Sequence, residues 1–396
     1  MERYNIPGTL KYFGEPAEKL RASKPIHAAA GYYDDLDAAI SFHPFYMLPL
    51  CNTTRWNTHC GVGYGVMYTF RCDNAETWIS SPDDSPIPAS HSATRCPGAT
   101  DAVLQMYTMS KMFKEHMISN NVGWSMNETI TTVGQATADN IPAQIGQIHF
   151  FIRVPDVEMA ETVIRVLDKN AEAAAIATHC TWEKDWIAKS RPGLPNHVMA
   201  DITYKNLEIA GPPVYNTAAK EKAREIQKNL GYEPMENPFI DEIQNLISPQ
   251  ECEEKLRKVL PEWQENFTSD DYTEFCWHAP TVRLYVGRPA LRPPQPGKAY
   301  PAWVMNALGG IRECIDPTFV TASKTIGMTI IDLLTKPELL QAAKDEFIER
   351  TGGGIGGSKW IPCLCDYEPP IDFRWPEYIT TERGENQWWI PAKGDK

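Results

Sequence analysis

Two neighbouring segments decide the fold of this chain: GTLKYFGEPAEK (residues 8–19) and GYYDDLDAAISFHP (residues 31–44). Residues 9–13 alternate imperfectly, are rich in aromatic side chains and stop at a glycine and a proline, which predicts a buried strand. Small and acidic residues over 28–39 predict a helix and a turn. The run AAISFHP then predicts a second short strand that ends at His43.

These two predicted strands would bring polar side chains to one crevice. Ligands of open α/β sheets bind outside the carboxyl ends of the strands. Glu18, Lys19 and His43 are therefore the first candidate site residues. A solvated turn and a capping histidine would explain the same residues equally well.

Composition limits the possible functions. A length of 396 residues exceeds one simple core and predicts two domains. The net charge of -13 argues against nucleic acid or an anionic membrane as a partner and favours small molecules. The sequence offers no apolar run long enough for a membrane span and no signal-peptide pattern, so we expect a cytoplasmic protein. The ten scattered cysteines are expected to be reduced.

The middle of the chain has the pattern of an inserted α+β unit. A glycine-rich strand is followed by an amphipathic helix, two strands, a second helix and a further strand, which is the order of a ferredoxin-like fold. The predicted elements lie at 60–72, 99–117, 127–134, 146–154 and 156–178. We therefore expect domain segments at 1–54, 55–196 and 197–396, of which the middle one is the insert.

The first stretch resembles the central segment of the aminoacylase and carboxypeptidase type of zinc peptidase, in the branch that contains the aminobenzoyl-glutamate hydrolases. In that family a strand ends in an Ala-Glu-Glu turn, whose first glutamate is the general base and whose second binds metal. The resemblance places Glu18 on the base and Lys19 on the ligand, where an ammonium has no lone pair to give. His43 falls on a ligand histidine.

The resemblance also covers the insert. It implies an α/β fold: a phosphorylase/hydrolase-like mixed-sheet catalytic domain, three-layer α/β/α but incomplete, with an inserted ferredoxin-like domain that forms a homodimer. ASHSATRCPGATDAV places His91 on the residue that reaches the neighbouring subunit's site, and TADNIPAQ places Asn140 on a substrate-binding amide. In FFIRVPD, Arg153 is a partner for a substrate carboxylate. Taken singly, these three are a surface histidine, a turn former and a surface charge.

The segment TSDDYTEFCWHAPTVRLYVG (268–287) combines an acidic turn with a buried strand. The turn resembles the family's Asp-Val-Gly-Asp-Val-Ser-Trp signature, which lines the crevice, and this places Asp271, Glu274 and Trp277 at the substrate. A charged loop that opens a strand is the plainer interpretation. Further on, Pro301 stands where the family has its last zinc ligand, a histidine.

These replacements lead to an expectation of no metal and no cofactor, because a catalytic zinc needs about three protein ligands. The family's first metal motifs lie far upstream of the Ala-Glu-Glu turn, so that half is either lost or supplied by another chain. We expect a diverged amidohydrolase that acts on a small carboxylate or amide, such as an N-acyl amino acid. Glu18 would be its base, assisted by Lys19, His43 and His91, in hydrolysis, cyclisation or isomerisation. The alternatives are an inactive homologue that binds a carboxylate or partners an active subunit, and a zinc amidohydrolase completed by a second chain.

Overall fold

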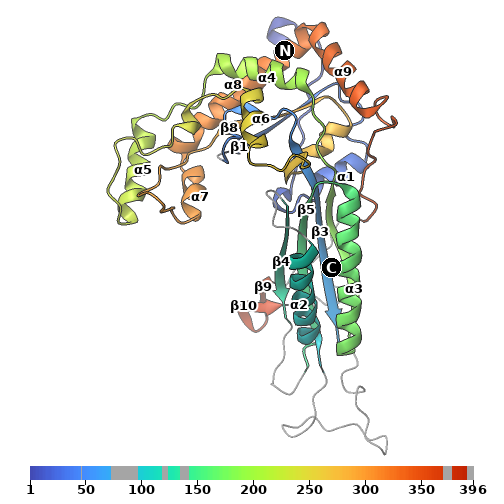
Figure 1. Ribbon diagram of the computed structural model, residues 1–396. Helices are drawn as coiled ribbons and strands as arrows, with labels where there is room; N and C mark the ends of the chain where they lie inside the picture. The colour runs from blue at the N-terminus through green and yellow to red at the C-terminus, as the bar shows by residue number, and fades with distance from the viewer. Residues whose placement is uncertain (46, 73–96, 118–123, 134–141, 369–376, 390–396) are drawn as a thin grey trace, which may run out of the picture.

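The computed structural model describes residues 1–45, 47–72, 97–117, 124–133, 142–368 and 377–389 (Figure 1). His91 and Asn140 lie outside these residues. Within the described segments, the chain forms a mixed α/β structure with a three-stranded sheet and a separate, larger antiparallel sheet. No helix in the described segments has the length and apolarity that a membrane span requires.

The three-stranded sheet positions the candidate site. Its strands are β1 (Ala39–Phe45), β8 (Thr281–Gly287) and β2 (Thr53–Thr54), in the order β1-β8-β2. Strands β1 and β8 run parallel, with His43 opposite Tyr285, and β2 runs antiparallel to β8. The predicted strands at AAISFHP and TVRLYV are therefore confirmed.

Side chains of β8 alternate between two faces, as the period of two in a strand requires. Val282, Leu284 and Val286 pack among helix residues in two apolar clusters. The residues between them, among which are Arg283 and Tyr285, point to the opposite face. In the parallel partner β1, Ser41 and His43 share that opposite face, so one side of the sheet is apolar and the other carries polar groups.

Helices cover the apolar face. Helix α4 (His197–Ala210) and helix α8 (Arg312–Thr335) pack on β8, and α9 (Pro337–Thr351) packs on α4 and α8. The N-terminal end of α4 is closed by Asn196, whose side chain accepts a hydrogen bond from the backbone N–H of Met199, as expected at an N-cap. The remaining helices of this part are α1 (Ser23–Ala29), α5 (Thr217–Asn229), α6 (Pro249–Arg257) and α7 (Trp303–Gly310).

The second sheet has the topology that the sequence predicts for the insert. Its order is β4-β5-β3-β6, and each neighbouring pair is antiparallel, which is the ferredoxin-like arrangement. Helices α2 and α3 pack on one face of it (Figure 1). The strands are β3 (His59–Arg71), β4 (Ser125–Thr132), β5 (Ile145–Val154) and β6 (Thr181–Ser190), and the helices are α2 (Ala99–Met117) and α3 (Val157–Thr178). The role of this unit in a homodimer stays a prediction.

The short strand β7 (Asn266–Ser269) joins the two parts of the molecule. It pairs parallel with the start of β3, in the ferredoxin-like unit. The chain then passes through Asp270 and Asp271 into the short 3-10 helix η5 (Tyr272–Trp277), which contacts β1 and β8. Residues between the two sheets are thereby held at a fixed place. The hairpin β9 (Glu377–Thr381) and β10 (Gly384–Trp389) completes the described strands.

The predicted strand at residues 9–13 is wrong. The structure has no regular element there, and the next element is the 3-10 helix η2 (Glu18–Leu20). Tyr12 is 94% exposed and Leu10 is 62% exposed, so the aromatic and apolar side chains that suggested a strand do not line a core. Without a neighbouring strand to bond and a surface to cover, an alternating pattern gains nothing from extended pairing.

Candidate functional site

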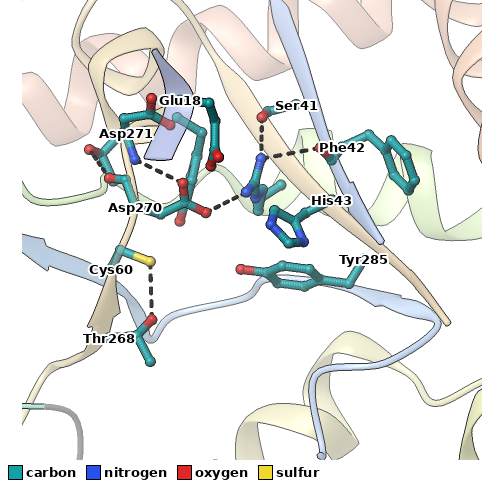
Figure 2. Close-up of polar contacts among 12 residues, drawn as sticks. Glu18, Ser41, Phe42, His43, Cys60, Thr268, Asp270, Asp271 and Tyr285 are labelled. Atoms are coloured by element: carbon teal, nitrogen blue, oxygen red, sulfur yellow. Dashed lines mark hydrogen bonds and ion pairs between the residues drawn. The ribbon is translucent and has the colours of Figure 1, made fainter. Parts of the chain in front are cut away.

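Three carboxylates from distant segments meet beside the polar face of the three-stranded sheet. One carboxylate oxygen from each of Glu18, Asp270 and Asp271 lies within 4.8 Å of the other two (Figure 2). Glu18 begins η2, where the residues on both sides of the short helix, Ala17 and Arg21, have left-handed backbone angles. This tight turn directs Glu18 at the two aspartates that precede η5.

Each of the two aspartates is paired with a buried cation. The Lys24 ammonium on α1 donates a hydrogen bond of 2.9 Å to Asp271, and both side chains are almost fully buried. The Arg283 guanidinium on β8 donates to Asp270 and, at 2.5 Å, to the Ser41 hydroxyl on β1. Both negative charges are thus balanced by side chains of the protein itself.

The two aspartates differ in acidity. Burial alone would raise the pKa of Asp270, but the positive charges of Arg283 and Arg21 outweigh it and lower that pKa. Burial raises the pKa of Asp271 to about 6, and the neighbouring charge of Asp270 adds to the increase, while Lys24 opposes it. Asp270 is therefore a fixed negative charge, and Asp271 changes its protonation near neutral pH.

His43 lies at the same face as a neutral imidazole. Burial lowers its pKa, and the charge of Arg283 lowers it further. Its Nδ1 lies 2.8 Å from the Pro44 carbonyl oxygen, which can only accept, so Nδ1 carries the proton and Nε2 has a lone pair. Figure 2 places the ring beside Tyr285, on the side toward Asp270. His43 can therefore accept a proton in this site.

Two arginines extend the site onto the ferredoxin-like unit. The guanidinium groups of Arg21 and Arg153 both stack on the Phe151 ring, with centroid distances of 4.7 and 4.6 Å. Arg21 donates to the Ser269 hydroxyl, next to Asp270, and Arg153 donates to neutral oxygens on β4. In the part of the chain that is described, neither forms an ion pair.

The exposed charge of this pair calls for an anion. Burial lowers the pKa of Arg153 to about 10, and the positive charge of Arg21 contributes to the decrease. Two guanidinium groups held close together, with hydroxyl and amide partners in place of carboxylates, favour a negatively charged ligand group between them. The pair is thus suited to a carboxylate.

The structure places the other predicted residues elsewhere. The Lys19 side chain is 96% exposed and reaches Glu18 at 3.9 Å, so the cation inside the cluster is Lys24 and not Lys19. Glu274 and Trp277 lie in the protein interior. Glu274 pairs with Arg191, and the Trp277 indole donates to the Pro192 carbonyl at 2.7 Å. These two residues hold η5 in place and do not contact the carboxylate cluster.

Sequence reasoning missed Arg21, Lys24, Asp270 and Arg283. Arg283 had a signal, because it is a charged residue at an inner position of the apolar strand TVRLYV. Asp270 had a weaker one, its position beside a predicted site residue. Nothing in the local sequence around Arg21 or Lys24 separates them from surface cations.

A zinc ion, which the resemblance implies, does not fit this set of residues. The three clustered donors are all carboxylate oxygens, whereas zinc sites are built mainly from histidine nitrogen and cysteine sulfur. Two of the three are already bound to Lys24 and Arg283. His43 is not in the group of described residues whose ligand atoms converge.

Comparison with known proteins bears on the branch named above. The chain is 26% identical over 230 residues to one of the two polypeptides of p-aminobenzoyl-glutamate hydrolase from Escherichia coli, its B subunit. The predicted resemblance is confirmed. The match covers 58% of this chain and 44% of the relative, so the chain spans less than half the length of that protein. No protein-family model matches the chain.

Solved structures of similar proteins were also found. An aminobenzoyl-glutamate utilization protein from Klebsiella pneumoniae aligns with a TM-score of 0.44 and 12% identity, over 80% of this chain and 60% of that one. A dinuclear metal-binding peptidase from Bacillus subtilis aligns with a TM-score of 0.38 and 12% identity, over 81% of this chain and 64% of that one.

Proposed function

We propose that this chain is an amidohydrolase-like enzyme that acts on a small N-acyl amino acid or related carboxylate without zinc, with Glu18 as general base. The observation that carries the proposal is the position of Glu18 between two kinds of charge. On one side are aspartates that Lys24 and Arg283 neutralise, and on the other is the unpaired couple of Arg21 and Arg153.

The substrate class follows from the arginines and from the relative. A carboxylate held between Arg21 and Arg153 would lie next to Ser269 and hence near Asp270 and Glu18. An acyl amino acid has such a carboxylate a few bonds from its amide. Aminobenzoyl-glutamate, the substrate in the name of the Escherichia coli relative, is therefore the first compound to test.

Hydrolysis needs one proton taken and one delivered. Glu18, whose side chain is about half exposed, removes a proton from a water molecule as its oxygen forms a bond to the amide carbon. The C–N bond breaks, and the same proton passes to the departing amine, so that a carboxylic acid and an amine are the products. Neutral His43 supplies a second acceptor at Nε2, and Arg21 and Arg153 keep the substrate in register.

The test is turnover of aminobenzoyl-glutamate by purified, metal-analysed protein. Glu18→Gln keeps the size of the side chain but removes the base, so we expect turnover to fall by about a hundredfold or more, with substrate affinity retained. Arg153→Ala should instead raise the KM or Kd. Unchanged turnover in Glu18→Gln would refute the base assignment, and stoichiometric zinc in the active protein would refute the metal-free proposal.

A binding role without turnover is the second candidate. It is favoured by the same charge balance, because Lys24 and Arg283 face carboxylates of the protein and not the place of a reacting carbonyl. Aminobenzoyl-glutamate that binds in an Arg153-dependent way without product formation would support this candidate.

A further inference from the structure

The carboxylate cluster is neutralised from within the protein. Glu18, Asp270 and Asp271 bring three negative charges to a space in which their nearest oxygens lie within 4.8 Å of one another. Such a group of hard oxygen donors is the kind of site that Mg²⁺, Mn²⁺ or Ca²⁺ prefers. Here the positive charge comes from Lys24, Arg283 and, through its effect on Asp270, Arg21.

Lys24 and Arg283 do not hold their positions in the same way. Arg283 belongs to strand β8, stacks on the Tyr272 and Tyr285 rings and bonds to Ser41, so its place is set by the sheet. Lys24 comes from the short helix α1, on the other side of the cluster. Among the described residues, its ammonium makes its hydrogen bond to Asp271 alone, at 2.9 Å.

An ammonium and a metal ion make competing demands on the same oxygens. Lys24 is a compact point charge with three N–H donors, and Asp271 is held against Asp270, whose Oδ1 accepts from the Asp271 backbone N–H at 2.8 Å. A divalent cation that used Asp271 would have to displace the ammonium or lie against it. In a buried site with little water, that repulsion is strong.

We propose that Lys24 is a resident replacement for a divalent cation: its ammonium occupies the charge position among Glu18, Asp270 and Asp271, and its removal creates a divalent-cation site. This deepens the proposed function, because it explains how the site remains charge-balanced without a metal. Its test does not depend on turnover, so the two can fail separately.

The experiment measures thermal unfolding of the full chain with and without Mn²⁺. Wild-type protein should show no shift of the Tm, because Lys24 excludes the ion. Lys24→Met removes the charge at nearly constant length, and its Tm should rise by about 5 °C or more at a hundredfold excess of Mn²⁺ over the Kd. Isothermal titration should give one ion per chain, bound at least tenfold more tightly than to the wild type.

Two further variants identify the site. Lys184→Met breaks another lysine–aspartate pair, with Asp168 at 2.7 Å on the ferredoxin-like unit, and should show no Mn²⁺ response. Lys24→Met combined with Asp271→Asn should lose the response that Lys24→Met gains. A response in both Lys24→Met and Lys184→Met would overturn the proposal, and so would an equal response in the wild type.

Failure to fold is also informative. If Lys24→Met folds only when Mn²⁺ is present, the ion has replaced the ammonium and the proposal is supported. Lys24→Gln, which retains a hydrogen-bond donor for Asp271, is prepared in parallel. If either variant folds and binds no Mn²⁺, Lys24 is an ordinary buried ion-pair partner and the proposal is refuted. The same conclusion follows if neither variant folds with or without the ion.

Discussion

Glu274→Gln tests whether the predicted site residue Glu274 holds the structure or binds a ligand. The carboxylate accepts hydrogen bonds from the Arg191 backbone N–H at 2.7 Å and from its Nε at 2.8 Å. Both side chains are 0% exposed. The Arg191 guanidinium also donates to the carbonyl groups of Ile361 and Glu274. This pair therefore ties η5 to the end of β6 and to the segment around residue 361.

The substitution leaves a buried charge without its partner. A glutamine can accept through one oxygen, but its NH₂ group meets N–H donors of Arg191, and the guanidinium loses its counter-charge. Removal of one member of a buried ion pair costs about 3–5 kcal/mol of the free energy of unfolding. Since the whole free energy of unfolding is about 5–15 kcal/mol, the variant should be close to unfolding under mild conditions.

Urea unfolding followed by tryptophan fluorescence measures this loss. The matched control is Glu225→Gln, which removes a carboxylate from the exposed pair with Lys222 at 3.1 Å and should change the free energy of unfolding by less than about 0.5 kcal/mol. If Glu274→Gln cost no more than this control, the structural role assigned to the Arg191 pair would be wrong. Weaker ligand binding at unchanged stability would instead support the role at the substrate that the sequence suggests.

Two further outcomes concern the cluster itself. Since burial raises the pKa of Asp271 from 3.8 to about 6, the native chain binds more protons than the unfolded chain between these values, so this residue lowers the free energy of unfolding as the pH rises from 4 to 7. The decrease is about 3 kcal/mol at most and should vanish in Asp271→Asn, as urea titrations at several pH values would reveal; a pH-independent difference between the two proteins would contradict it. Gly63→Ala should weaken carboxylate binding severalfold in a calorimetric titration, because a Cβ there would lie 2.9 Å from the Arg21 Nη1 and 2.9 Å from the Ser190 hydroxyl. Gly310→Ala, where no atom lies within 4 Å, is its control, and equal affinities in the two variants would exclude a role for Arg21.

Local patterns in the sequence determined the secondary structure of the ferredoxin-like unit and the strands of the small sheet. The alternation in TVRLYV fixes which residues of β8 share a face, because side-chain direction along a strand depends on position alone. The same rule puts Ser41 and His43 together on β1. The strand predicted at residues 9–13 failed because pairing needs a neighbour, which a short pattern does not specify.

Only the tertiary structure decided which charges meet. Lys24 and Asp271 are 247 residues apart, and Arg283 and Ser41 are 242 residues apart. Lys19 and Lys24 look alike in the sequence, yet one is in solvent and the other is buried against a carboxylate. The direction of a side chain is set within a few residues, whereas its partner is set by the packing of β7, η5 and α1 around the sheet. For this reason the sequence identified Glu18 and His43, and the fold was needed to supply the cations that surround them.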